Sequence, residues 1–222
     1  MRFLGKPHDY GTLTPYDPNS DNILSSSDGK FKVPSLTGYR KIAEAKANNN
    51  STLDFRSVFT DNYYNNVPGQ DYLITIYDLR ATANTALRFR WLNGSTASTS
   101  NYYYGYSYAS ATGSNYGQGS HEGGISGAGH LVIYAGTNTR STNHAWISLN
   151  PHTGPTQHTA LNAFYVGRSH TISGTSYARV GTANVTQSAT TSPFDGIRFF
   201  MEAGNISDGV FSIYHKNYGL HL

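Results

Sequence analysis

FDGIRFFMEAGNISDGVFSIYHK, residues 194–216, is the stretch that decides the fold. Isoleucine, phenylalanine and methionine alternate with arginine, phenylalanine and glutamate over 197–202, and a similar alternation returns over 211–214. A period of two is typical of strands whose two faces meet different surroundings. The dipeptides Gly204-Asn205 and Asp208-Gly209 stand between the runs, and they tolerate the backbone conformations of tight turns. The stretch therefore predicts two strands that close the chain as a β-hairpin.

Composition extends this prediction to the whole chain. Of 222 residues, 13% are charged, 23 are glycine and 18 are tyrosine. Long helices would need more leucine, alanine, glutamate and lysine. A chain of this length buries a sizeable core, and all-β sandwiches of this size are commonly single domains. We predict an all-β fold: a jelly-roll-like antiparallel β-sandwich over residues 39–222, preceded by an extended N-terminal arm.

Alternating patterns recur between the arm and the closing stretch, with glycine, asparagine and serine between them. They predict eleven short strands: Tyr39–Lys46, Thr52–Phe59, Tyr72–Leu79, Ala86–Asn93, Tyr102–Ser110, Gly129–Ala135, His144–Asn150, Ala163–Ser169, Tyr177–Thr186, Gly196–Glu202 and Gly209–His215. The one competing helix, IAEAKA at residues 42–47, is too short to be stable alone. Residues Ala111–Gly129 are rich in glycine and serine and are predicted to form a long surface loop.

The N-terminal segment, residues 1–38, contains four of the eight prolines. Each proline removes a backbone donor and restricts the residue before it, so a long helix or an interior strand is excluded here. We expect an extended arm that docks on another subunit. The candidate docking residues are its large apolar side chains: Phe3, Leu4, Tyr10, Leu13 and Tyr16.

Cysteine content and charge exclude several classes of function. Without cysteine the chain has no disulfide, no thiolate zinc site and no thiol catalysis. The net charge is +3, but lysine and arginine form no long run, which disfavours nucleic-acid binding. Since no long apolar run or signal-peptide core occurs, we expect synthesis in the cytoplasm and no membrane insertion.

Glycoside cleavage is the enzymatic activity most worth testing, and it uses two carboxylates at a defined separation. The chain has three glutamates, and its ten aspartates stand mostly in turns, where aspartate stabilises the backbone. Glu202 with a loop aspartate such as Asp195 is the candidate pair. Alternation also places Glu202 on the face of Arg198, which predicts a surface ion pair of small energetic value. Turn stabilisation is the simpler interpretation, so no catalytic residue is assigned.

Nine histidines raise the question of a metal site. None belongs to an HxH or HExxH motif, and the nearest pair, His152 and His158, spans a loop that contains proline. No metal or cofactor site is therefore assigned. One alternative stays open, because a single histidine repeated around a threefold axis binds a metal without any sequence motif.

Tyrosine is concentrated in NYYYGYSYAS, residues 101–110. If this segment is a strand, its alternate tyrosines share one face and Tyr103 takes the other. Tyrosine joins a broad ring to a hydrogen-bonding tip, which suits subunit contacts and sugar stacking alike. The alternative is that the stripe covers a half-buried outer sheet face, where tyrosine has high β propensity. The candidate contact surface consists of Tyr102, Tyr104, Tyr106 and Tyr108.

The closing run FDGIRFFMEAGNISDGVFSIY resembles the end of a β-sandwich module in virion proteins of tailed bacteriophages, especially marine and cyanobacterial phages. In those phages the module often ends a fibre or a surface-structural protein. Three further segments fit the resemblance, at residues 39–81, 86–106 and 144–153. Together the segments cover residues 39–214, whereas residues 1–38 match nothing.

The resemblance implies a non-enzymatic structural protein on the virion surface, made in the host cytoplasm. We expect a homotrimeric short fibre or receptor-binding head, held by other virion proteins through residues 1–38 and contacting a host surface glycan or protein. The alternative is a capsid decoration (cement) protein that stabilises the head shell, which the short chain and the missing shaft sequence fit equally well. A polysaccharide depolymerase and a cellular carbohydrate-binding sandwich are the further alternatives.

Overall fold

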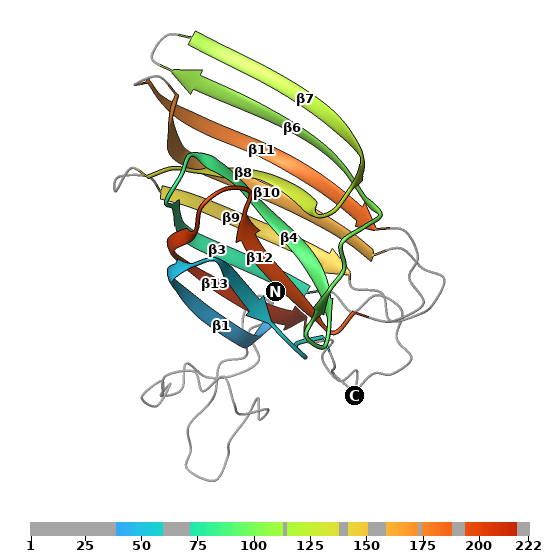
Figure 1. The fold of residues 1–222 in the computed structure, drawn as a ribbon. Coiled ribbons are helices and arrows are strands. Elements are labelled where there is room, and N and C mark those ends of the chain that lie inside the picture. Colours follow the sequence, from blue (N-terminus) through green and yellow to red (C-terminus); the bar gives the residue numbers. More distant parts are fainter. Residues whose placement is uncertain are drawn as a thin grey trace, which may run out of the picture.

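The computed structural model of the chain describes residues 39–59, 72–112, 115–137, 142–150, 159–172, 175–187 and 194–216. These residues form thirteen strands in two antiparallel sheets that pack face to face, and they include no helix (Figure 1). Within the same ranges no helix is long and apolar enough to cross a membrane. The predicted all-β antiparallel sandwich is confirmed, while its jelly-roll-like detail and the extended arm stay predictions.

The larger sheet has eight strands, and every neighbouring pair in it is antiparallel. From edge to edge it consists of β1 (Tyr39–Asn50), β13 (Ile206–Lys216), β3 (Tyr72–Ala81), β9 (Thr142–Asn150), β10 (Thr159–Ile172), β11 (Thr175–Gln187), β6 (Tyr102–Thr112) and β7 (Asn115–Ser126).

The smaller sheet has five strands. It consists of β2 (Thr52–Phe55), β12 (Gly196–Met201), β4 (Thr85–Asn93) and β5 (Thr96–Ala97), with β8 (Gly129–Ala135) also paired to β4. We call the faces that the two sheets turn toward each other the inner faces, and the opposite ones the outer faces.

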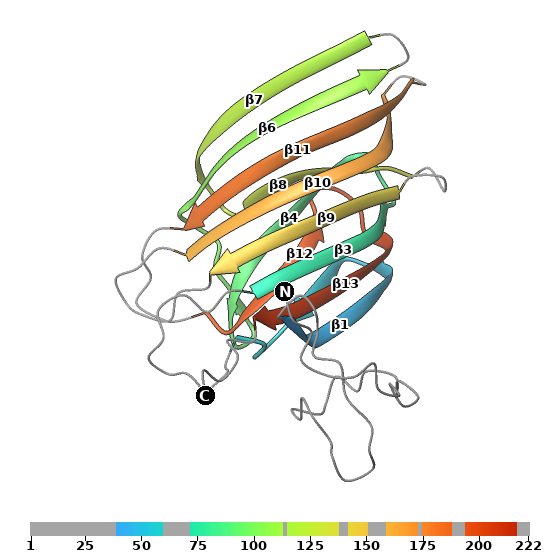
Figure 2. The same ribbon diagram turned by 180° about the vertical axis from the view of Figure 1, so that it is seen from behind.

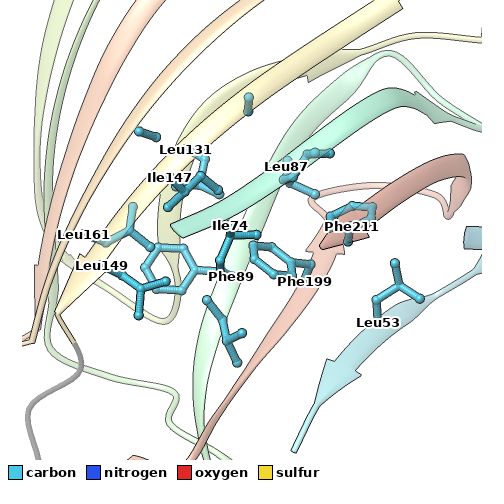
Figure 3. Close-up of a cluster of buried hydrophobic side chains, with 14 of the residues drawn as sticks. Leu53, Ile74, Leu87, Phe89, Leu131, Ile147, Leu149, Leu161, Phe199 and Phe211 are labelled. Carbon is cyan, nitrogen blue, oxygen red and sulfur yellow. The ribbon is translucent and has the colours of Figure 1, made fainter. Parts of the chain in front are cut away.

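The hydrophobic core lies between the inner faces. Figure 3 shows Ile74 and Phe211 of the larger sheet among Phe89 and Phe199 of the smaller one, and all four are fully buried. Aromatic rings meet edge to face in this layer, as Phe89 and Trp91 do with centroids 5.4 Å apart. Burial of each such side chain contributes about 2 kcal/mol to the free energy of unfolding.

Strand β4 shows how alternating apolar residues contribute to this core. Leu87, Phe89 and Trp91 point inward and are buried, whereas Arg88 and Arg90 lie on the outer face and are partly exposed. This arrangement agrees with the predicted period of two, and it assigns the two arginines to a solvated face rather than to a cationic stripe.

The two closing strands do not pair with each other. β12 pairs with β2 and β4 in the smaller sheet, whereas β13 pairs with β1 and β3 in the larger sheet. The predicted hairpin is therefore wrong, because the turn at Gly204, with a φ of 72°, carries the chain from one layer to the other. Phe199 and Phe211 pack across the layers with ring centroids 5.3 Å apart. Alternation showed which residues share a strand face, but it did not show which strands pair.

The segment predicted as a loop, Ala111–Gly129, is mostly strand. β6 extends to Thr112, and β7 pairs with it from Asn115 to Ser126. The loop prediction was wrong because a glycine-rich composition lowers strand propensity without removing the backbone groups that pair with a neighbour. Here glycine has a packing role, since a Cβ on Gly119 would lie 2.8 Å from the ring of Tyr108.

Other strand limits differ from the prediction by a few residues. β2 ends at Phe55 instead of Phe59, and Ser57 beyond it has a positive φ of 52° that interrupts the strand. β10 is longer than predicted at both ends, and the two-residue strand β5 was not predicted.

The larger sheet is wider than the smaller one. β8 packs against β10, β11 and β6, so it covers part of their inner face. In both views β6 and β7 extend beyond the strands of the smaller sheet (Figures 1 and 2). The inner face of the larger sheet is thus only partly covered near this edge.

Candidate binding surfaces

The predicted tyrosine stripe lies on the inner face of β6, near the partly covered edge. Cross-strand register sets Tyr104, Tyr106 and Tyr108 opposite Val185, Ala183 and Gly181 of β11. Val185 and Ala183 are buried, so the three tyrosines share the inner face. Tyr103 points the other way and is 42% exposed. The alternate tyrosines therefore share one face of β6, as predicted, and that face is the inner one.

Tyr102 shares this face but differs from the other three in its surroundings. It is fully buried, its hydroxyl accepts a hydrogen bond from the backbone N–H of Trp91 at 2.9 Å, and it donates to the carbonyl of Ser98 at 3.3 Å. Burial raises the pKa of Tyr102 to about 12. Tyr102 therefore belongs to the core and cannot contact a partner.

We call the remaining three residues, Tyr104, Tyr106 and Tyr108, the tyrosine row. The rings of Tyr104 and Tyr106 are nearly parallel, with centroids 6.4 Å apart and planes at 4°. Tyr108 follows at 6.3 Å from Tyr106. All three rings are partly buried, and His130 of β8 packs against Tyr104 and Tyr106 at 5.3 and 5.5 Å.

The side chain of Arg179 lies beside Tyr108, at the end of the tyrosine row. The guanidinium carbon of Arg179 on β11 lies 4.9 Å from the ring centre of Tyr108, a cation–π contact. Glycine flanks Tyr108 on both neighbouring strands, as Gly181 on β11 and Gly119 on β7. A Cβ on Gly119 would meet the Tyr108 ring, so the glycine allows that ring to lie against β7.

A second surface, which the sequence analysis missed, lies on the outer face of the larger sheet. Among the described residues every exposed large apolar side chain lies on this face: Tyr77 (40%), Tyr103 (42%), Phe164 (45%), Val166 (39%) and Val180 (41%). Trp146 joins them, with its ring 6.5 Å from Tyr77 and 5.8 Å from Phe164. We call Tyr77, Trp146, Phe164, Val166 and Val180 the outer band.

Register explains why the band is continuous. Trp146 stands opposite Phe164, and Val166 stands opposite Val180, so the side chains run from β9 across β10 to β11. Among the outward side chains within 144–148 of β9, 160–166 of β10 and 178–186 of β11, none is Asp, Glu, Lys or Arg. A sequence signal existed, since AFYV at 163–166 is apolar at odd and even positions and so predicts apolar side chains on both faces.

The two acidic side chains of the candidate carboxylate pair are engaged in local contacts. Glu202 pairs with Arg88 at 2.6 Å, not with Arg198 as predicted, because Arg198 pairs with Asp54 on the neighbouring strand. Asp195 accepts hydrogen bonds from the backbone N–H of Gly94 and the hydroxyl of Ser57. The candidate carboxylate pair thus supports structure at both of its positions.

Two other predicted sets lie outside the described residues. They are the docking residues Phe3, Leu4, Tyr10, Leu13 and Tyr16, and the histidine pair His152 and His158. In the part of the chain that the structure describes, no group of three His, Cys, Asp or Glu side chains is placed to hold a metal ion.

No protein-family model, curated protein or solved structure matches this chain.

Proposed function

We propose that this chain is a non-enzymatic structural protein on the exterior of a tailed-bacteriophage particle. In this proposal it forms the homotrimeric head of a short fibre or receptor-binding protein and is held by other virion proteins through residues 1–38. The outer band is the observation that carries the proposal, because contiguous apolar surface on a folded protein is typical of interaction sites, contacts with other proteins among them. The resemblance of residues 194–214 to the closing motif of phage surface modules supports the location on a phage particle.

The composition of the outer band fits a protein contact. Interface centres are enriched in aromatic residues and depleted in charge, and both features hold here. The ring of Trp146 packs against those of Tyr77 and Phe164, and all three stand on paired strands, so docking costs little side-chain entropy. Polar Ser148, Asn162 and neighbouring threonines of β11 surround them, as in the rim of an interface.

A capsid decoration protein is the second candidate. It needs the same contact with protein, and a short chain without shaft repeats suits it equally well. A depolymerase is a third candidate with less support, because Glu202 and Asp195 are already held by Arg88 and by backbone and hydroxyl donors.

Electron microscopy of particles labelled with an antibody to this protein tests the proposal directly. Label at the tail supports the fibre head, and label spread over the icosahedral shell supports the decoration protein instead. Particles that carry no label, from a preparation in which the protein is expressed, would contradict both.

Light scattering of the purified chain tests the oligomer. We expect three times the 24.3 kDa of one chain, and a stable 24.3 kDa species at micromolar concentration would contradict the homotrimer. Phe164→Asp should lower the mass if the outer band is the contact, because a charge is buried there without a partner. Tyr103→Asp is the matched control, since Tyr103 is an equally exposed aromatic on the same face but outside the band.

Removal of residues 1–38 tests the arm. We expect the truncated protein to fold, with an unchanged β-sheet circular dichroism spectrum, and to be lost from particles. Normal incorporation of the truncated protein would contradict docking through the arm.

A further inference from the structure

The tyrosine row packs against the edge of the hydrophobic core and keeps part of its surface exposed. Its neighbour on the same face, Tyr102, is fully buried and hydrogen-bonded in the core. Tyr104, Tyr106 and Tyr108 keep part of their surface exposed, because β6 lies near the edge where the larger sheet extends beyond the smaller one (Figure 1). The row therefore presents aromatic surface on the inner side of a curved sheet.

The spacing of the row suits a chain of ring-shaped units. Successive rings lie 6.4 and 6.3 Å apart, because residues two apart on a strand share a face. The C–H groups of a sugar ring carry partial positive charge and pack on the electron-rich face of an aromatic ring. Several rings in a line along one strand are thus complementary to consecutive sugar units of an extended oligosaccharide.

Charge decides which oligosaccharide fits. Arg179 is the one charged side chain among the described inner-facing residues of β11 and β6, and its guanidinium carbon lies 4.9 Å from the ring centre of Tyr108. A guanidinium attracts a carboxylate or sulfate and binds it through its N–H groups. No described acidic side chain shares this inner surface, so an anionic group meets attraction without repulsion.

The site is also held in shape before any ligand arrives. Gly119 and Gly181 flank Tyr108, and a Cβ at Gly119 would overlap its ring. At Gly181 a Cβ would meet the hydroxyl end of Tyr165 from β10, so that ring lies across the same strand. Rings fixed by the backbone beneath them lose little freedom on binding, which favours affinity.

We infer that Tyr104, Tyr106, Tyr108 and Arg179 form a binding site for an anionic oligosaccharide, with sugar rings on the tyrosines and an acidic substituent at Arg179. This inference deepens the proposed function, on which it rests only for the source of the glycan, a host surface. A neutral glycan and a second copy of this chain are the competing occupants, and the experiment separates them.

Isothermal titration calorimetry of the full-length protein tests the site with two probes of similar length. One is a polyuronate hexasaccharide, and the other is the neutral hexasaccharide cellohexaose. We expect binding of the polyuronate that weakens as salt is added, because the Arg179 contact is ionic. Tyr106→Ala and Arg179→Ala should each weaken this binding by about tenfold or more. Tyr103→Ala, on the opposite face of the same strand, should leave it unchanged.

Four results would overturn the inference. They are no polyuronate binding at millimolar concentration, equal affinity for cellohexaose, equal losses from Tyr103→Ala and Arg179→Ala, or a lower oligomer mass for Tyr106→Ala in light scattering. Thermal melting of each variant shows whether a loss of binding follows from unfolding. If Tyr106→Ala is unfolded, the binding of Arg179→Ala decides the test. Immunolabelling of particles does not depend on glycan binding, so failure of the site and failure of the proposed function are distinguishable.

Discussion

An ion pair on the outer face of the smaller sheet gives the sharpest stability prediction. Arg198 of β12 stands directly opposite Asp54 of β2 and donates two hydrogen bonds to it, from Nε to Oδ1 and from Nη2 to Oδ2, both at 2.6 Å. Arg56 reaches the same carboxylate at 2.8 Å from a more exposed position. We predict that Asp54→Asn destabilises the protein, because an amide oxygen accepts from the guanidinium more weakly and without charge.

The expected magnitude follows from exposure. The side chains of Asp54 and Arg198 are 15% and 23% exposed, so their pair is less screened than an ordinary surface pair. Replacing a charge-assisted, bidentate contact by one neutral hydrogen bond then lowers the free energy of unfolding by about 2 kcal/mol. Arg56→Ala is the matched control, since the Arg56 side chain is 54% exposed and its loss costs at most about 1 kcal/mol.

The effect depends on pH in a defined direction. The hydrogen bond from Arg198, followed by that from Arg56, holds the pKa of Asp54 below its ordinary value of 3.8, against the opposing effect of burial. Because the folded-state pKa is the lower one, the pair stabilises the fold fully above the unfolded pKa, near pH 4, and this stabilisation is lost as pH falls through the folded pKa. The wild type and the Asp54→Asn variant should converge in stability in strong acid.

Urea unfolding followed by circular dichroism measures these differences at about pH 7 and at about pH 2. A double-mutant cycle with Asp54→Ala and Arg198→Ala isolates the pairwise energy, which we expect to exceed about 1 kcal/mol at neutral pH. A coupling energy near zero, or a difference between wild type and variant that persists unchanged in acid, would refute the reasoning.

Two further substitutions test the packing around the tyrosine strand by the same urea assay. Gly129→Ala should cost about 2–3 kcal/mol, because the new Cβ would overlap the buried ring of Phe89, and a cost below about 0.5 kcal/mol would show that the ring is free to move. Tyr102→Phe should cost about 1–2 kcal/mol, because it leaves the buried N–H of Trp91 without its acceptor, whereas Tyr103→Phe should be neutral, and equal effects would contradict the assignment.

The sequence predicted faces better than it predicted partners. Alternation correctly put Phe199 on one face with Ile197 and Met201, and that face is buried. It also placed Tyr103 opposite its neighbours on β6. It failed to pair β12 and β13 correctly for two reasons. The backbone N–H and C=O groups of each strand could find hydrogen-bond partners in either sheet. The turn residues between them also suit both a hairpin and a connection from one sheet to the other. Strand order is set by contacts between residues distant in the chain, which a local pattern does not contain.

Two errors concern residues whose role is set by their neighbours. Gly119 indicates a loop when it is considered alone, but beside Tyr108 it is the residue that lets a ring lie against the next strand. Alternation placed Glu202 and Arg198 on one face, yet they pair with Arg88 and Asp54 of the adjacent strands. Residues four apart along an extended chain are separated by about 13 Å, whereas side chains on adjacent strands lie within reach of each other. Neither outcome is visible until the register is known.

The two candidate surfaces are related by the same alternation. Arg179 and the buried Gly181 point inward on β11, and Val180 between them points outward into the outer band. A second protein seated on the outer band therefore covers no ring of the tyrosine row by that contact, because the sheet itself separates them. Assembly and glycan binding can thus occur together on one chain, as a receptor-binding head requires. A decoration protein needs only the first surface, so loss of particle attachment without loss of polyuronate binding, on changing Phe164, would favour the head.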